Sequence, residues 1–507
     1  MTPSVVHMLA DAAARAPDAE ALVCGPDRLT YRAFARCVAG FARDLETQGV
    51  RGGRVALLME NSIDIVIAMF AAQAAGAQVL PLNPAYTPSE LDPILRDAEP
   101  AVVLRGMQGL TRWRDAAACM LSDDLLPDAD TLAALQYTGG TTGRAKGVDL
   151  THRATAVNIL QREAVLPTSD TDRILSVAPL YHVYAITMGL HLAVQARGTL
   201  VIMPRYDPAE LLRLLRDERI SVFAGNPRLF AELLSQPGLS DIGGSLRLCV
   251  SGSAPLPAEV LQRWETATGV PICEGYGQTE AGPVLSYNSP HAERKPGSVG
   301  RALPDTELQI VDLETGVRVL PVGEAGEIRA RGPQVMRGYR NRPEETAAAL
   351  RDGWLYTGDI GELDTDGVLF IRGRRKEMVI VSGFNVYPRE VEDVLHAHPD
   401  VHEAAVVGRP DARRGEALVA FVVTRGEAVD VAAVGVHLAE RLTRYKLPSE
   451  IRVLEALPRT AVGKIDKQRL QEMARQATDG VTAARNTPAA PSPSHRSGSD
   501  RSRTPSV

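Results

Sequence analysis

Hydrophobic and polar positions over the first 130 residues alternate between helical and extended patterns. Ala68–Ala77 is a run of small, mostly apolar residues, which is typical of a buried helix. Val79–Leu82 is a short apolar segment that ends at Asn83-Pro84, and it predicts a strand. Further along, Asp207-Pro208-Ala209-Glu210 predicts a helix start, with an aspartate cap, a proline in the first turn and Glu210 completing a capping box.

Three later strand candidates each lead into a loop of unusual composition. They are Ala134–Tyr137, Leu246–Val250 and Val270–Cys273, and glycine- or serine-rich segments follow them. Alternation of strands, loops and helices is typical of α/β sheets, in which ligands bind beyond the carboxyl ends of the strands. The sequence therefore predicts an α/β fold with a binding site at these strand ends.

A charged segment, Gly373–Glu377, follows the strand candidate Val368–Ile371 and marks a change in character. About a hundred residues with their own α/β pattern come next, which is a reasonable size for a small domain. We predict one domain over residues 1–375, a second over residues 376–476, and a disordered tail rich in Ser, Pro and Arg over residues 477–507.

Composition narrows the function classes. The chain has 507 residues and a net charge of −6, which gives no reason to expect nucleic-acid binding. Its apolar stretches, residues 63–82 and 180–203, are interrupted by polar side chains, so we expect buried elements and no transmembrane segment. The N-terminus lacks the pattern of a signal peptide, and the scattered cysteines predict thiols in a reducing cytoplasm. The cysteines are Cys24, Cys37, Cys119, Cys249 and Cys273.

The strongest local signal is a run rich in glycine and threonine that ends with a lysine. Glycines let backbone N–H groups approach an anion, hydroxyls add donors and the lysine adds positive charge, as a triphosphate requires. The run is not a Walker A loop, because Ala145 precedes the lysine and Gly147 follows it. Taken alone, it also fits a flexible surface loop. Its members are Thr138, Gly139, Gly140, Thr141, Thr142, Gly143 and Lys146.

Further segments have a distinctive composition. Gly275-Tyr276-Gly277-Gln278-Thr279-Glu280 places an aromatic residue, a hydroxyl and a carboxylate beside glycines. Tyr356–Asp359 ends with a carboxylate. The other segments are Pro179–His182, Ser251–Pro255, Val381–Pro388 and Pro458–Ile465.

In order and spacing, these segments resemble the adenylate-forming superfamily of acyl- and aryl-CoA ligases, peptide-synthetase adenylation domains and beetle luciferases. The resemblance covers residues 10–475 and is nearest to bacterial medium- and long-chain fatty-acid–CoA ligases. It implies a large N-terminal domain of α/β-sheet subdomains plus a distorted β-barrel, followed by a small mobile α+β domain. It also implies ATP, Mg²⁺ and CoA as cofactor or co-substrates.

The resemblance implies a role for each matching residue in the nucleotide site. Tyr276 would pack on the adenine, Asp359 would bind the ribose, and Arg374 would contact the ribose or a phosphate. Thr279 would contact the α-phosphate, and Glu280 would help to hold Mg²⁺. The loop from Thr138 to Lys146 would bind the phosphates, and the nucleotide site would also include Ser253, Ala254, Gly275 and Gly277.

Four residues are implied in the acyl site and in switching between half-reactions. His182 would border the acyl site and is a candidate base for the thiol. Lys376 would act as the hinge of the second domain, and Gly383 would leave room for the pantetheine arm of CoA. Lys464 would bridge carboxylate and phosphate oxygens while the acyl-adenylate forms.

The acid is the least determined part of the prediction. The expected pocket segments, residues 184–190, 222–233 and 275–287, are mostly apolar, and Gly275 offers no cation to a second carboxylate. A fatty acid is therefore favoured over a dicarboxylic acid. Gln278 stands where relatives more often carry Met or Leu, and Gly139, Ala145 and Arg459 also depart from the common pattern without removing a required charge.

Other functions remain open from sequence alone. They are a fatty acyl-AMP ligase that loads an acyl carrier protein, an aryl-CoA ligase, a non-catalytic nucleotide-binding protein and a luciferase-like oxygenase. The absence of an obvious insertion between Glu280 and Lys376 favours CoA over a carrier protein. A homodimer and a peripheral position at the inner membrane are compatible with the sequence.

Overall fold

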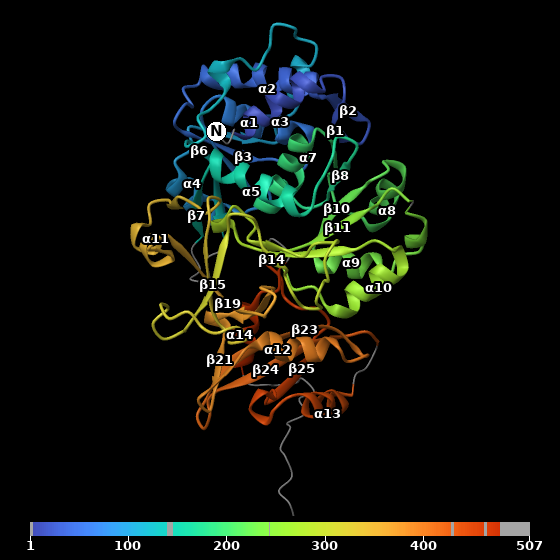
Figure 1. The fold of residues 1–507 in the computed structure, drawn as a ribbon, viewed down its shortest axis with the longest axis vertical. Coiled ribbons are helices and arrows are strands. Elements are labelled where there is room, and N and C mark those ends of the chain that lie inside the picture. Colours follow the sequence, from blue (N-terminus) through green and yellow to red (C-terminus); the bar gives the residue numbers. More distant parts are fainter. Residues whose placement is uncertain (1–3, 139–144, 243, 427–429, 461–463, 477–507) are drawn as a thin grey trace, which may run out of the picture. The chain divides into compact units, whose positions relative to one another are not determined.

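The structure of the 507-residue chain is a computed structural model that describes residues 4–138, 145–242, 244–426, 430–460 and 464–476. The chain divides into two compact units, residues 1–376 and residues 377–507 (Figure 1). Both units combine helices with sheets, so the predicted α/β fold is confirmed.

The first unit is built on a nine-stranded sheet with the order β14-β13-β12-β11-β10-β8-β9-β1-β2. Its central strands from β12 to β1 run parallel, and β2, β13 and β14 are antiparallel to their neighbours. The strands are β1 (Glu20–Cys24), β2 (Asp27–Thr30), β8 (Arg173–Ser176), β9 (Thr199–Ile202), β10 (Val222–Gly225), β11 (Leu248–Ser251), β12 (Ile272–Tyr276), β13 (Ser286–Tyr287) and β14 (Arg301–Ala302).

A six-stranded sheet and a five-stranded sheet complete the strands of the first unit. The six-stranded order is β17-β7-β6-β4-β3-β5, with strands β3 (Arg54–Leu58), β4 (Gln78–Leu82), β5 (Val102–Arg105), β6 (Leu132–Thr138), β7 (Lys146–Thr151) and β17 (Gly338–Tyr339). The five-stranded sheet is antiparallel and occupies the place of the expected barrel. It contains β15 (Glu307–Val311), β16 (Gly326–Arg331), β18 (Leu350–Arg351), β19 (Trp354–Leu363) and β20 (Leu369–Arg374).

The helices of the first unit pack against its three sheets, and they cover both faces of the nine-stranded sheet. They are α1 (Val5–Arg15), α2 (Tyr31–Glu46), α3 (Ile63–Ala74), α4 (Pro88–Ala98), α5 (His152–Val165), α6 (Val183–Ala185), α7 (Leu192–Ala196), α8 (Pro208–Asp217), α9 (Pro227–Leu233), α10 (Ala258–Thr268) and α11 (Pro343–Ala349). Helices α8, α9 and α10 lie together on one face, where Leu211, Phe230 and Trp264 share a core with the strands (Figure 1). The core on the other face joins this sheet to the six-stranded sheet through α2 and α3.

Local sequence explains where these helices begin. Helix α3 is buried on all sides except at Asp64, as its mostly apolar sequence predicts. Asp207 caps α8 by accepting a hydrogen bond from the N–H of Glu210 at 2.8 Å. The predicted capping box is wrong, because the Glu210 side chain binds Arg213 at 2.6 Å instead. No described helix is both long and apolar enough to cross a membrane.

Among its described residues, the second unit has one five-stranded sheet and three α-helices. Its sheet has the order β22-β21-β24-β23, and β25 pairs in parallel with β24. The strands are β21 (Val379–Val381), β22 (Phe384–Val386), β23 (Val401–Asp411), β24 (Gly415–Thr424) and β25 (Glu450–Val453), and the helices are α12 (Pro388–His396), α13 (Val431–Arg441) and α14 (Lys467–Arg475).

Candidate active site

Part of the predicted nucleotide site follows the carboxyl ends of the parallel strands in the nine-stranded sheet, whereas Lys146, Asp359 and Arg374 lie on strands of the other two sheets. The register of β10, β11 and β12 aligns Gly225, Ser251 and Glu274 at this edge. The buried Glu274 carboxylate accepts a hydrogen bond from the N–H of Leu256 at 2.9 Å, which fixes the loop after β11. In that loop Ser253 has a φ of +70°. Such left-handed backbone at a non-glycine residue often marks a functional loop.

Strand β12 is longer than predicted, because it continues through Gly275 and Tyr276. These residues pair with Tyr287 and Ser286 of β13, which keeps them extended where the sequence predicted a loop. The extension also explains Gly275, since a Cβ there would lie 2.2 Å from the ring of Tyr287. The Tyr287 ring therefore fills the space that a side chain at residue 275 would need.

Tyr276, Asp359 and Arg374 lie in direct contact. The Tyr276 hydroxyl donates to Oδ2 of Asp359 at 2.7 Å, and Nε of Arg374 lies 3.1 Å from Oδ1. Asp359 and Arg374 are directly opposite each other on β19 and β20. Burial, and then the neighbouring Asp359 carboxylate, raise the pKa of the Tyr276 hydroxyl far above its usual value. The structure thus brings together an aromatic ring, an acceptor and a cation that the sequence places far apart.

A second cluster contains Glu280, Tyr339 and Lys146. The Tyr339 hydroxyl donates to Oε1 of Glu280 at 2.8 Å, and Nζ of Lys146 lies 4.9 Å from the centre of the Tyr339 ring. Tyr339 was missed by the sequence analysis. It is held beside Lys146 because β17 pairs with β7, and no feature of the segment Arg337–Arg340 indicates that pairing.

The short helical turn η5 (Thr279–Ala281) carries Thr279 and Glu280 immediately after β12. Its position depends on Gly277, where a Cβ would lie 2.1 Å from the carbonyl oxygen of Pro283. The main chain of Glu280 is also fixed, because its carbonyl accepts from the N–H of Met336 at 2.8 Å. These contacts hold the carboxylate of Glu280 next to Tyr339.

Strands β6 and β7 bracket the predicted phosphate loop. Thr138 and Lys146 are paired across the two strands, so both ends of the loop are fixed at one point. The predicted residues Gly139, Gly140, Thr141, Thr142 and Gly143 lie outside the described residues.

His182 precedes α6 and acts as its cap. Its Nδ1 accepts a hydrogen bond from the N–H of Tyr184 at 3.3 Å. This contact lets His182 orient the segment that begins at Tyr184, and its role as a base stays a prediction.

Tyr184 and Tyr287 line the expected acyl site. A Cβ at Gly252 would lie 3.3 Å from the Tyr184 ring, and a Cβ at Gly275 would lie 2.2 Å from the Tyr287 ring. Each tyrosine ring therefore packs against a glycine, and the contact at Gly275 is the tighter of the two. Burial, followed by the neighbouring Tyr287 hydroxyl, raises the pKa of Tyr184. Neither hydroxyl meets the geometry of a hydrogen bond with any described residue. The π-helix η3 (Ile186–His191) follows directly after α6.

The predicted residues of the second unit lie on two separate hairpin-like segments. Ser382 and Gly383 form the turn between β21 and β22, with φ of +52° and +86°, as in a type I′ turn. Lys464 is exposed and precedes a bridge between Ile465 and Arg459, and its carbonyl accepts from the N–H of Thr460 at 2.8 Å. Lys376 is the last residue of the first unit and lies in the helical turn η6 (Arg375–Glu377).

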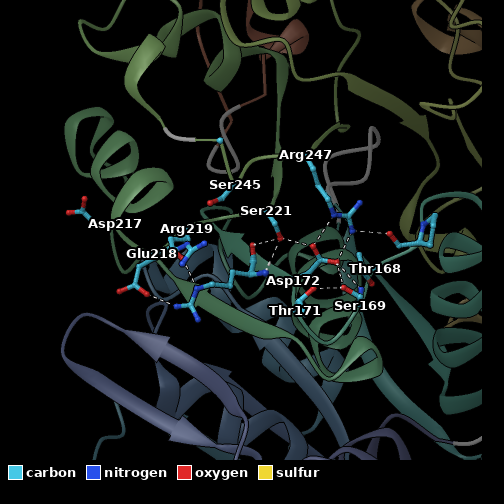
Figure 2. A pocket seen from close by; sticks show the side chains of 13 residues that line it. Thr168, Ser169, Thr171, Asp172, Asp217, Glu218, Arg219, Ser221, Ser245 and Arg247 are labelled. Atoms are coloured by element: carbon cyan, nitrogen blue, oxygen red, sulfur yellow. Dashed lines mark hydrogen bonds and ion pairs between the residues drawn. The ribbon is translucent and has the colours of Figure 1, made fainter.

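A large polar cavity lies at the opposite edge of the nine-stranded sheet. Figure 2 shows this cavity of about 940 Å³ around Asp172, Ser221 and Arg247, which stand at the amino ends of β8, β10 and β11. Asp172 binds Arg247 and Ser221, each at 2.6 Å. Burial alone would raise the pKa of Asp172, but these partners outweigh burial and lower it. The network satisfies its own charges and stabilises the strand ends.

Comparisons with known proteins agree with this geometry. A family model described as "AMP-binding enzyme" matches residues 9–340, and one described as "AMP-binding enzyme C-terminal domain" matches residues 390–464. The long-chain-fatty-acid–CoA ligase of Bacillus subtilis is 36% identical over 92% of this chain and 93% of that protein. The indoleacetate–CoA ligase of Aromatoleum aromaticum is 36% identical over 89% of this chain and 95% of its own length. The structure of ATP-bound MatB from Rhodopseudomonas palustris is 34% identical and superposes with a TM-score of 0.87, covering 94% of this chain and 99% of that one.

Proposed function

The chain belongs to the AMP-binding enzyme family and is an AMP-forming acid–thiol ligase, and we propose that it joins a fatty acid to CoA through an acyl-adenylate. The contact of Tyr276 with Asp359 and Arg374, beside the cluster of Glu280, Tyr339 and Lys146, carries this proposal. One cluster suits a nucleoside and the other suits phosphates with a cation. Both lie within the first unit, as binding of ATP requires.

In the first half-reaction, the substrate carboxylate forms a bond to the α-phosphorus of ATP, and the bond to the β-phosphate oxygen breaks to release pyrophosphate. A carboxylate is ionised at neutral pH and needs no base, so repulsion between anions is the main barrier. We assign Lys146, Thr279 and Lys464 to offset that repulsion and orient the phosphates. Asp359 and Arg374 hold the ribose end.

The residues present fit a magnesium ion. Among the residues that the structure describes, no three His, Cys, Asp or Glu side chains form a metal-binding group. A single carboxylate, Glu280, is nevertheless adequate, since Mg²⁺ commonly keeps phosphate oxygens and waters as its other ligands. When bound, Mg²⁺ would neutralise charge on the phosphates.

In the second half-reaction, the sulfur of CoA bonds to the acyl carbon, the bond from that carbon to the AMP oxygen breaks, and the thiol proton goes to solvent or to the AMP leaving group. We propose that rotation about Lys376 exchanges Lys464 for the Gly383 turn between the two steps. The Ser382-Gly383 turn has a tight left-handed backbone that lets a narrow thiol arm approach.

The pocket walls support a monocarboxylic acid. The ring of Tyr287 occupies the space above Gly275, where a cation for a second carboxylate would have to stand. Buried apolar neighbours, among them Val250 and Ile186, share the core cluster with Tyr287. Curated relatives named for indoleacetate and ferulate show that similar chains are assigned aryl acids, so aryl acids are the alternative to fatty acids.

The test is to measure AMP formation with ATP, Mg²⁺ and a panel of alkyl and aryl acids, with and without CoA. Thioester formation that requires CoA supports the proposal, and the preferred acid identifies the substrate. Lys464→Ala should reduce adenylate formation by about 100-fold or more. Lys446→Ala, which also removes a lysine of the second unit, should leave adenylate formation near the wild-type rate.

Three outcomes would contradict parts of the proposal. Adenylate that transfers only to an added acyl carrier protein would reassign the acceptor. Full adenylation by Lys464→Ala would remove that lysine from the mechanism. Turnover of aryl acids alone would replace the fatty acid by an aryl acid and leave the chemistry unchanged.

A further inference from the structure

Lys467 is held between two carboxylates in the second unit. Its Nζ lies 3.0 Å from Oε2 of Glu377 and 2.9 Å from Oε1 of Glu392. The three side chains are partly buried: the exposed fraction is 24% for Lys467, 27% for Glu377 and 15% for Glu392. Partial burial weakens screening by solvent, so these ion pairs are stronger than those on an open surface.

Each partner of Lys467 belongs to a different functional part of the unit. Glu377 is the first residue after Lys376, the proposed hinge. Glu392 belongs to α12, and its Oε1 also accepts from the N–H of Val406 in β23 at 2.8 Å. Lys467 therefore connects the start of the unit to α12 and, through Glu392, to the edge strand β23 of its sheet.

Lys467 is also near Lys464 in the sequence, and hydrogen bonds fix the backbone between the two lysines. It is the first residue of α14 and follows Lys464 by three positions. The N–H of Asp466 donates to the carbonyl of Pro458 at 2.8 Å, and its side chain caps α14 by accepting from the N–H of Arg469 at 2.9 Å. With the Arg459–Ile465 bridge, these contacts leave little freedom between the two lysines.

Lys467 is held in its protonated form by the two carboxylates. Burial by itself would lower the pKa of Lys467, but Glu392 and Glu377 outweigh it, and the pKa lies above its usual value. A neutral side chain in this position would leave two carboxylates facing each other without the cation between them. Those carboxylates would separate, and Glu377 would lose its connection to α14.

We propose that Lys467 is a positioning residue that fixes Lys464 at a set distance from the hinge, so that rotation about Lys376 carries Lys464 into the nucleotide site as part of a rigid body. This role rests on the function proposed above. Its effect is expected mainly on the first half-reaction. The Gly383 turn that serves the second lies between Glu377 and Glu392 in the chain, but its hairpin is held by the pairing of β21 with β22 and with β24.

The test uses full-length Lys467→Met and measures the two half-reactions separately. Adenylate formation is followed by pyrophosphate exchange, and thioester formation is followed from presynthesised acyl-AMP and CoA. Adenylate formation should fall about 10- to 100-fold, because a small displacement of a reacting group costs that much. Thioester formation should stay within about twofold, and Lys467→Arg, which keeps the cation, should restore adenylate formation.

Lys446→Met is the matched control. Lys446 pairs with Glu390 of the same helix, α12, and the two side chains are 22% and 25% exposed, so this variant removes a similar ion pair that contacts neither Glu377 nor α14. It should leave adenylate formation unchanged. Equal loss of both half-reactions in Lys467→Met, or an equal effect of Lys446→Met, would reduce Lys467 to a purely structural role.

Failure of this inference is distinguishable from failure of the proposed function. If Lys464→Ala abolishes adenylate formation and Lys467→Met does not reduce it, the positioning role is overturned and the function stands. If Lys464→Ala leaves adenylate formation intact, the proposed function is at fault.

Discussion

At the scale of single residues, Asp359 is the best example of a side chain whose chemistry depends on its neighbours. It is only 5% exposed, yet it has both a hydroxyl donor and a guanidinium in contact. These two donors hold the carboxylate in one orientation. It is therefore ready to accept hydrogen bonds from two adjacent hydroxyls of a ribose.

We expect Asp359→Asn to weaken binding of a non-hydrolysable ATP analogue by about tenfold or more, because hydrogen bonds to a charged acceptor are the stronger kind. Titration calorimetry measures the change. Glu362→Gln is the control, since Glu362 lies on the same strand and pairs with Arg372 in the same way. Unchanged affinity in Asp359→Asn, or an equal loss in the control, would exclude a specific contact with the nucleotide.

Tyr287 gives a second prediction, on stability. Its buried hydroxyl has no hydrogen-bond partner among the described residues, whereas the Tyr137 hydroxyl donates to Asp97 at 2.6 Å. Removing an unsatisfied buried hydroxyl is neutral or stabilising, and removing a satisfied one costs about 1 kcal/mol. In urea unfolding, Tyr287→Phe should therefore leave the free energy of unfolding unchanged or raise it, whereas Tyr137→Phe should lower it. A large loss of stability in Tyr287→Phe would indicate a partner for its hydroxyl.

The sequence predicted functional residues only where they belong to a short motif. Tyr276, Glu280 and Asp359 could be proposed as site residues because each lies in a short segment of distinctive composition. Tyr339 was missed because its role comes from the pairing of β17 with β7, a contact between residues about 190 positions apart that no local pattern encodes.

At the scale of elements, glycines determine how closely β12 and its following turn approach their neighbours. We expect Gly277→Ala to reduce adenylate formation strongly, because its Cβ would displace the chain at Pro283 and with it the turn that carries Glu280. The carbonyl at 2.1 Å is main chain and cannot move aside as a flexible side chain would. Pyrophosphate exchange measures the loss.

Gly244→Ala is the control for that variant. Nothing lies within 4 Å of a Cβ at Gly244, so this substitution should leave both folding and adenylate formation unchanged. Normal activity in Gly277→Ala would mean that the turn after β12 adapts and that its position is not critical.

Element boundaries show where local sequence loses its predictive value. The start of α8 was predicted correctly from Asp207 and Pro208, since a cap acts within one turn. The end of β12 was not, because glycines usually interrupt a strand and only pairing with β13 keeps Gly275 extended. Packing between distant segments decided that case.

At the scale of the whole molecule, sensitivity to acid is concentrated in the first unit. His152 and His191 are almost fully buried there, and burial lowers the pKa of each to about 3. In the second unit the pKa of His437 is also lowered by burial, but its side chain is partly exposed. The two units should therefore respond differently to a fall in pH.

The sign follows from the difference between folded and unfolded chains. An unfolded histidine binds a proton near pH 6.5, and these two cannot do so while folded until about pH 3. The contribution of the two neutral histidines to the stability of the folded chain is fully present above pH 6.5 and is lost as the pH falls toward 3. Below pH 6.5 each should lower the free energy of unfolding by about 1 kcal/mol per pH unit.

Tryptophan fluorescence can follow the first unit alone, because all three tryptophans, Trp113, Trp264 and Trp354, belong to it. In urea unfolding, the free energy of unfolding should fall as the pH is lowered from 7 to 5. In His191→Leu this fall should be smaller by the amount that one buried histidine contributes. His191 packs edge-on against Phe70 and has no hydrogen-bond partner among the described residues, so leucine leaves no donor or acceptor unsatisfied. A dependence as steep in His191→Leu as in the wild type would mean that this histidine is not kept neutral by burial, and that the acid sensitivity of the unit comes from its carboxylates.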